Sequence, residues 1–241
     1  MQMKVRKRWL RFGATISLIA LSLSSSLATP SESRCSDDAM LVFDGSGSMA
    51  EMGFNGLDQP RITEARAALR QSLPEITPHR DLGLIVYGPG AGDVCSNVDL
   101  RFEPSPNAAK KIISEIDGII PDGNTPLTRA VEDAADALKY KEKAGVVVLI
   151  TDGKETCGGA PCQLASKLAA TAKDLVVHVI GFKVRSAFFT WNSGENSEAS
   201  LHNNIVARCL ADRTGGLYTS TESTEELVEA LRKNLACPFI G

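Results

Sequence analysis

Short apolar runs alternate with amphipathic segments along most of the chain. Two of the apolar runs, 146–151 and 175–181, are rich in valine and isoleucine and show no alternation of apolar and polar positions. Runs of this kind are typical of strands that are covered on both faces of a sheet. We therefore predict strands at 39–43, 82–87, 98–102, 146–151, 175–181 and 217–219.

Between these runs, apolar residues recur at spacings of three or four, which predicts helices. The first helical pattern has Pro60 near its start and Pro78 beyond its end, and Pro161 opens the fourth, where proline is favoured. The five patterns cover residues 62–76, 112–116, 127–138, 164–169 and 227–235.

Strands that alternate with helices predict an α/β fold with right-handed crossovers. We expect one domain built on a doubly wound, mostly parallel sheet with helices on both faces. The run 98–102 follows its predecessor after only a loop, so it is predicted to be an antiparallel edge strand. Asp44 and Asp152 directly follow two predicted parallel strands, and the carboxyl ends of such strands meet at one edge, where ligands bind.

The first residues are predicted to be an export signal. A basic segment precedes an apolar span, 12–23, that is shorter than the ~20 residues of a membrane-spanning helix. Ser26-Leu27-Ala28 has the small-x-small pattern of a cleavage site, so we expect residues 1–28 to be a signal peptide cut near Ala28. An uncleaved signal anchor is the alternative. After cleavage we expect a short segment, 29–38, then the domain at 39–237, no membrane span, and a periplasmic or secreted location.

Removal of this leader makes the chain clearly acidic. It takes away five of the 26 Lys and Arg residues and none of the 29 Asp and Glu residues, so the net charge changes from −3 to about −8. Nucleic acids and anionic membranes bind basic surfaces, so neither is expected as a partner. The composition does not indicate an oligomeric state.

The cysteines indicate disulfides, because an even number in an exported chain favours them. Cys157 and Cys162 are separated by a turn-forming Gly-Gly-Ala-Pro segment, and a local bond between them is our first expectation. Cys237 is expected to pair either with Cys35, which lies before the first strand, or with Cys209. All six follow the leader: Cys35, Cys95, Cys157, Cys162, Cys209 and Cys237.

A group of oxygen-bearing side chains follows the first strand. Asp44, Ser46 and Ser48 alternate with glycines, so the three side chains can face one side of an extended turn. Thr125 presents a hydroxyl in a loop that enters a helix, and Asp152 ends a buried strand, where an idle carboxylate would be costly to desolvate. Oxygen ligands suit Mg²⁺ or Mn²⁺. Because this site has only two carboxylates, a cation bound there could accept another anionic oxygen.

These residues, in this order, resemble the metal-ion-dependent adhesion site of the von Willebrand factor A domain family, which includes the integrin inserted domains. The family pattern is Asp-x-Ser-x-Ser, then Thr, then Asp. Here it reads Asp44, Ser46, Ser48, Thr125 and Asp152, with no departure at these positions. The likeness extends over roughly residues 36–237.

The resemblance implies a Mg²⁺ or Mn²⁺ ion at the edge of the sheet and a role in adhesion without catalysis. Ser46, Ser48 and Thr125 would be direct ligands, and Asp44 and Asp152 would act through water. A protein ligand would bring a Glu or Asp carboxylate to complete the coordination.

Two other functions stay open: an envelope structural or assembly protein with a non-adhesive metal site, and a metal-dependent hydrolase. Catalysis has little support, because the chain has no Gly-x-Ser-x-Gly sequence and no histidine is predicted beside a nucleophile. His178 is expected to be a core residue inside a strand. Glu155, near the site, is expected to be an exposed acid, and the alternative is that it tunes the charge of the site. Residues 186–204 are expected to form a long polar loop.

Overall fold

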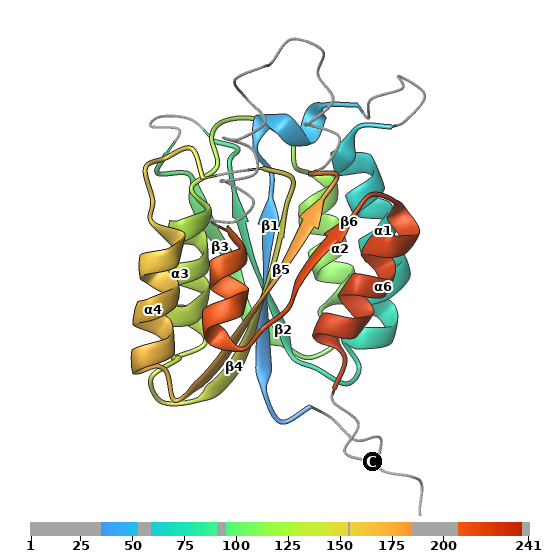
Figure 1. Cartoon of the computed structure of the whole chain (residues 1–241). Helices are drawn as coiled ribbons and strands as arrows, with labels where there is room; N and C mark the ends of the chain where they lie inside the picture. The colour runs from blue at the N-terminus through green and yellow to red at the C-terminus, as the bar shows by residue number, and fades with distance from the viewer. Residues whose placement is uncertain (1–34, 53–58, 91–94, 154, 185–206, 238–241) are drawn as a thin grey trace, which may run out of the picture. The chain divides into compact units, whose positions relative to one another are not determined.

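A six-stranded sheet forms the centre of the domain (Figure 1). The computed structural model describes residues 35–52, 59–90, 95–153, 155–184 and 207–237. All of them belong to the second of the two units into which the chain divides, Glu32–Gly241. The strands are β1 (Asp38–Asp44), β2 (Leu82–Tyr87), β3 (Val98–Ser105), β4 (Ala144–Thr151), β5 (Asp174–Phe182) and β6 (Tyr218–Thr221).

The strand order is β3-β2-β1-β4-β5-β6. All neighbouring strands are parallel except β2 and β3, which are antiparallel. The predicted open, mostly parallel sheet with an antiparallel edge strand is therefore confirmed. The strand order reverses at β1, because β2 lies on one side of it and β4 on the other.

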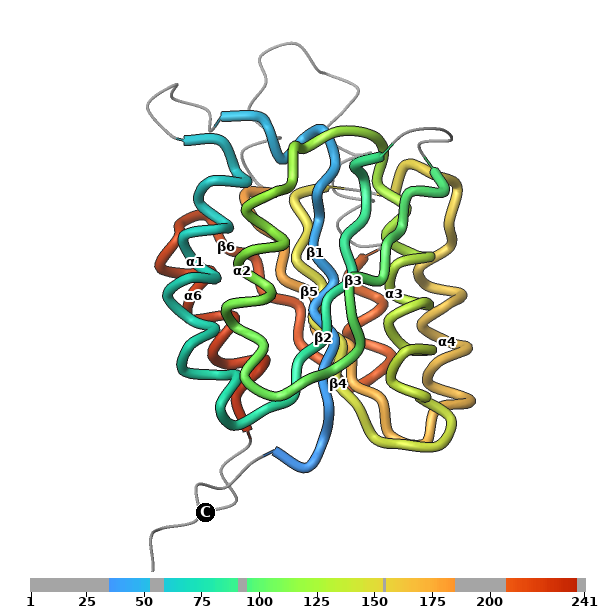
Figure 2. The backbone as a smooth tube through the Cα atoms, turned by 180° about the vertical axis from the view of Figure 1, so that it is seen from behind, coloured from blue at the N-terminus to red at the C-terminus, as the bar shows by residue number. Residues whose placement is uncertain are grey.

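Helices cover both faces of the sheet (Figures 1 and 2). One face packs against α1 (Arg61–Ile76), α2 (Ala109–Asp117) and α6 (Thr224–Leu235). The other packs against α3 (Leu127–Ala137), α4 (Pro161–Thr171) and a helical segment at 207–214. A short 3₁₀ helix, η1 (Gly47–Ala50), follows β1.

Alternate residues of β1 enter two separate apolar cores. Ala39, Leu41 and Phe43 join the core under α1, α2 and α6, whereas Met40 and Val42 join the core under α3 and α4. All of these side chains are fully buried. Both faces of the strand are therefore apolar, which is why the sequence shows no alternation there.

The sequence patterns do not predict the helical segment 207–214. Ala207, Leu210 and Ala211 have helical spacing and are buried against the sheet, but this apolar pattern is short. The polar loop expected at 186–204 lies outside the described residues.

Three disulfides join distant parts of the chain: Cys35–Cys237, Cys95–Cys157 and Cys162–Cys209. The first is one of the two pairings expected for Cys237. The local bond expected between Cys157 and Cys162 is wrong. Cys162 lies in the first turn of α4 and bonds to Cys209 in the helical segment 207–214, which the sequence patterns do not predict.

Disulfides are typical of proteins that fold in oxidising, extracytoplasmic compartments. Within the part of the chain that the structure describes, none of the helices has the length and apolar character needed to cross a membrane.

Candidate metal centre

The carboxyl ends of β1 and β4 bring the two predicted acids together at the point where strand order reverses. Phe43 in β1 is paired with Ile150 in β4, so Asp44 and Thr151 are the next neighbours. Asp152 follows Thr151 directly. In open sheets of this kind the reversal point forms a crevice where ligands bind.

The turn after β1 lies tightly against the end of β2. The Gly45 N–H donates to the Tyr87 carbonyl at 2.9 Å. A Cβ at Gly45 would lie 3.0 Å from the same oxygen and 2.9 Å from Pro89 Cδ, so only glycine fits without a shift of the neighbouring chain. This close approach fixes the start of the loop that carries the two serines.

A chain of hydrogen bonds connects four of the five predicted ligands. Asp44 Oδ1 accepts from the Ser46 N–H at 2.9 Å and from Ser46 Oγ at 2.5 Å. Ser46 Oγ and Ser48 Oγ are 3.2 Å apart. Ser48 Oγ then donates to Asp152 Oδ1 at 2.7 Å. On the other side of Asp44, Thr151 Oγ1 donates to Oδ2 at 2.8 Å.

Thr125 is brought to the same edge by backbone contacts of its loop. The Asp122 N–H donates to the Gly45 carbonyl at 3.0 Å, and the Gly47 N–H donates to the Gly123 carbonyl at 3.1 Å. Thr125 itself is buried. Across the residues that the structure describes, no hydrogen bond joins its hydroxyl to the other four predicted ligands.

Arg61, the first residue of α1, belongs to the site although the sequence patterns do not predict it. Its Nη1 lies 2.7 Å from Asp152 Oδ2 and 3.2 Å from Glu51 Oε2, and it also donates to the Ser48 carbonyl at 3.2 Å. No short motif marks this arginine, because its role depends on how α1 lies against the ends of β1 and β4.

Burial and like charge dominate the electrostatics of the site. Asp44 is fully buried and Asp152 nearly so. Burial, followed by the negative charge of Asp44, raises the pKa of Asp152 to about 7, against the opposing effects of Arg61 and Ser48. Burial and then the charge of Asp44 also raise the pKa of Tyr87 well above its usual value.

The donor set fits a hard divalent cation. Ligand oxygens that are neighbours around an octahedral Mg²⁺, with Mg–O distances of about 2.0–2.1 Å, lie about 3 Å apart. The Ser46 and Ser48 hydroxyl oxygens have a comparable separation, 3.2 Å. Among the described residues, no group of three or more His, Cys, Asp or Glu side chains is placed to hold a metal, so this site would depend on hydroxyls as well as carboxylates.

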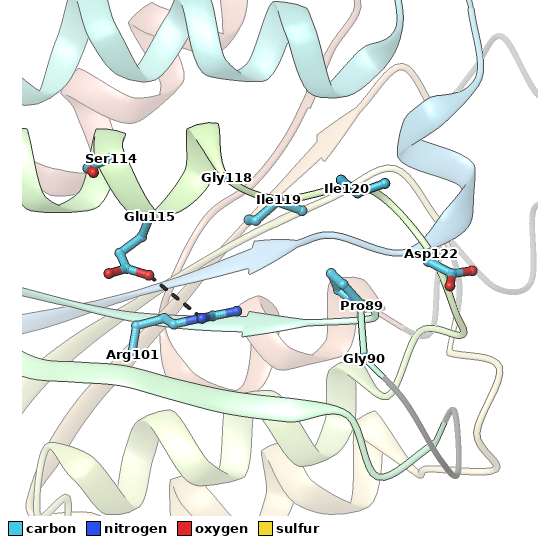
Figure 3. Close-up of a pocket in the computed structure, with 9 residues that line it drawn as sticks. All are labelled: Pro89, Gly90, Arg101, Ser114, Glu115, Gly118, Ile119, Ile120 and Asp122. Carbon is cyan, nitrogen blue, oxygen red and sulfur yellow. Dashed lines mark ion pairs between the residues drawn. The ribbon is translucent and has the colours of Figure 1, made fainter.

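A separate surface cavity of about 720 Å³ lies beside this edge of the sheet. Figure 3 shows Arg101 and Glu115 paired within it, with the exposed Ile120 near one end. The closest distance between the two charged groups is 3.7 Å. Asp122 lines this cavity and also contacts Gly45 through its backbone. None of the five predicted metal ligands lines it.

Comparison with known families agrees with the observed fold. Residues 39–155 match the family model described as von Willebrand factor type A domain. The match and the fold support a von Willebrand factor type A domain. The matched residues include all five predicted ligands of the metal.

Two curated relatives come from Bacillus subtilis (strain 168), and both are described as uncharacterized. YwmD is 28% identical over 223 residues, which cover 88% of this chain and 92% of YwmD. YwmC is 28% identical over 171 residues, which cover 66% of this chain and 72% of YwmC. Neither relative therefore supplies an activity.

Solved structures share this fold. BatB from Bacteroides thetaiotaomicron has a TM-score of 0.56 at 16% identity, over 82% of this chain and 98% of that chain. The pilus adhesin SpaC from Lactobacillus rhamnosus GG has a TM-score of 0.61 at 13% identity, over 84% of this chain and 30% of that chain. At these identities the likeness shows the fold alone.

Proposed function

We propose that this protein is an exported, non-enzymatic binding module that captures a protein ligand through Mg²⁺ or Mn²⁺. Asp44, Ser46, Ser48, Thr125 and Asp152 would hold the cation. When bound, the cation supplies a positive centre that accepts a Glu or Asp carboxylate oxygen from the ligand.

The observation that carries this proposal is the hydrogen-bond chain from Asp44 through Ser46 and Ser48 to Asp152, at the reversal point of the sheet. These hydrogen bonds hold the side-chain oxygens of the four residues close together. Both carboxylates are buried, and the guanidinium of Arg61 pairs with that of Asp152. A bound cation would offset the remaining negative charge, which is otherwise costly to bury.

Cation binding tests the proposal directly. We expect calorimetric titration of the oxidised protein with Mg²⁺ and with Mn²⁺ to show a single site. Asp44→Asn and Ser48→Ala should each abolish or strongly weaken it, while Asp174→Asn, at the opposite end of the sheet, should bind as wild type does. Two variants are used because Asp44 is fully buried and its replacement alone could alter folding. Wild-type protein that takes up neither ion at millimolar concentration would overturn the proposal.

Ligand capture tests the adhesive part of the proposal. We expect a protein from envelope extracts to bind the immobilised domain in Mg²⁺ and to be released by EDTA. Thr125→Ala should lose this capture. A metal-binding domain whose capture is insensitive to EDTA would instead favour a structural or assembly role. Metal-dependent turnover of phosphoesters, lost in Ser48→Ala, would favour a hydrolase.

A further inference from the structure

The segment after Asp152 also contacts the loop of Thr125. The Thr125 N–H donates to Thr156 Oγ1 at 2.8 Å, and the Thr156 N–H donates back to the Thr125 carbonyl at 3.2 Å. Both polar groups of the Thr125 backbone are therefore fixed by a single residue. Because Thr125 is buried, its N–H has no easy replacement partner if the Thr156 hydroxyl is removed.

Glu155 fixes the other end of the same loop, where α3 begins. Its Oε2 accepts from the N–H of Thr128 at 2.9 Å and from the Thr128 hydroxyl at 2.6 Å. Its Oε1 accepts from the Cys157 N–H at 2.8 Å. Pro126, the residue before α3, provides no side-chain cap, so a carboxylate from another loop takes that place.

A disulfide anchors this segment to the rest of the edge. Cys157 is bonded to Cys95, which belongs to the loop between β2 and β3. The Asn124 amide lies next to the same bond, with Nδ2 3.6 Å from Cys95 Sγ. Three loops that are distant in sequence therefore converge around Thr125, and a covalent bond connects two of them.

We propose that Glu155 and Thr156, anchored by the Cys95–Cys157 disulfide, are positioning residues that hold Thr125 in place for the cation. This inference rests on the proposed metal site. Thr125 does not share the hydrogen-bond chain of the other predicted ligands, so its position depends on the backbone contacts of its own loop and on its hydrogen bonds with Thr156. Residues that orient metal ligands typically change metal affinity by about 10–100-fold when they are replaced.

The sharpest test compares two variants of Thr156 by titration with Mg²⁺. Thr156→Val keeps the shape of the side chain but removes the acceptor for the Thr125 N–H, and we expect about tenfold weaker binding or more. Thr156→Ser keeps the hydroxyl, so its affinity should stay close to that of the wild type. A merely structural role would lower the thermal stability of Thr156→Val without changing its Mg²⁺ affinity.

The disulfides provide a second, matched comparison. Cys95→Ser/Cys157→Ser and Cys162→Ser/Cys209→Ser remove bonds with similar sequence separations, 62 and 47, so chain entropy predicts similar losses of stability. We expect only the first pair of substitutions to weaken Mg²⁺ binding.

Three outcomes separate this inference from the proposed function. Equal Mg²⁺ affinity in wild type and Thr156→Val would overturn the inference alone. So would equal weakening by both pairs of cysteine substitutions. Failure of the wild-type protein to bind Mg²⁺ or Mn²⁺ would overturn the proposed function, and the inference with it.

Discussion

Arg61 provides the positive charge that allows Asp152 to be buried next to Asp44. The Asp152–Arg61 pair is almost fully enclosed, with side-chain exposures of 0% and 7%. Removing one partner of such a pair leaves a buried charge without compensation. The arginine also contacts the Ser48 carbonyl and Glu51. One side chain of α1 therefore contacts both the segment after β1 and the residue that follows β4.

The partly buried His178 predicts how the stability of the fold depends on pH. Its Nδ1 accepts a hydrogen bond from the Leu217 N–H at 3.1 Å, and burial, followed by the charge of Arg80, lowers its pKa. The unfolded chain therefore binds more protons at acid pH. The stability from neutral His178 is complete above the unfolded pKa of about 6.5 and is lost as the pH falls toward the lower folded pKa.

We expect His178→Asn, which keeps an acceptor but does not titrate, to reduce this loss. Denaturant unfolding between about pH 7.5 and about pH 5 would measure it, since the slope of unfolding free energy against pH reports the difference in bound protons. Parallel curves for wild type and variant would contradict the prediction.

The helices differ in how their first turns are capped. In α6, Ser223 Oγ accepts from the Glu226 N–H at 3.2 Å, and Glu226 Oε2 accepts from the Glu222 N–H at 2.7 Å. This cap is local in sequence. In α3 the corresponding acceptor is Glu155, which lies 27 residues after Thr128. The start of α3 therefore depends on tertiary structure.

Glu155→Ala is expected to lower the free energy of unfolding by about 1 kcal/mol, the usual cost of losing a helix cap. Ser223→Ala, which removes the local cap of α6, is the matched control and should cost about the same. Urea denaturation of both variants would measure the two losses. An unchanged unfolding free energy in Glu155→Ala would contradict a capping role.

Elements that carry a continuous or periodic apolar pattern are the ones that the sequence predicts. The buried strands are predicted well, because both cores require continuous apolar residues in β1 and β4. Asp44 and Asp152 follow from those strands by simple geometry. Arg61 and Glu155 do not, since their contacts arise only when α1 and the β4–α4 loop reach the edge of the sheet. Glu155 was expected to be an exposed acid, and instead it caps α3.

For the whole molecule, the disulfides enclose loops of very different length. The sequence separations are 202 for Cys35–Cys237, 62 for Cys95–Cys157 and 47 for Cys162–Cys209. Chain entropy predicts stabilisation of about 5 kcal/mol for the longest loop and about 4 kcal/mol for each of the others. The bond between the two ends of the domain should therefore matter most.

Cys35→Ser/Cys237→Ser is accordingly expected to lower the free energy of unfolding by about 1 kcal/mol more than either of the other double substitutions. Guanidinium denaturation of the three double variants would rank them. A smaller loss than that of Cys162→Ser/Cys209→Ser would contradict the loop-length explanation.

The Cys35–Cys237 bond also has a mechanical consequence. Cys35 lies three residues before the first residue of β1, and Cys237 lies two residues after the last residue of α6. Tension applied to the polypeptide on either side of these residues would pass through one covalent linkage instead of pulling β1 away from its neighbours. An adhesive domain connected in this way would bear load without being stretched, and its ligand-binding edge would keep its shape under force.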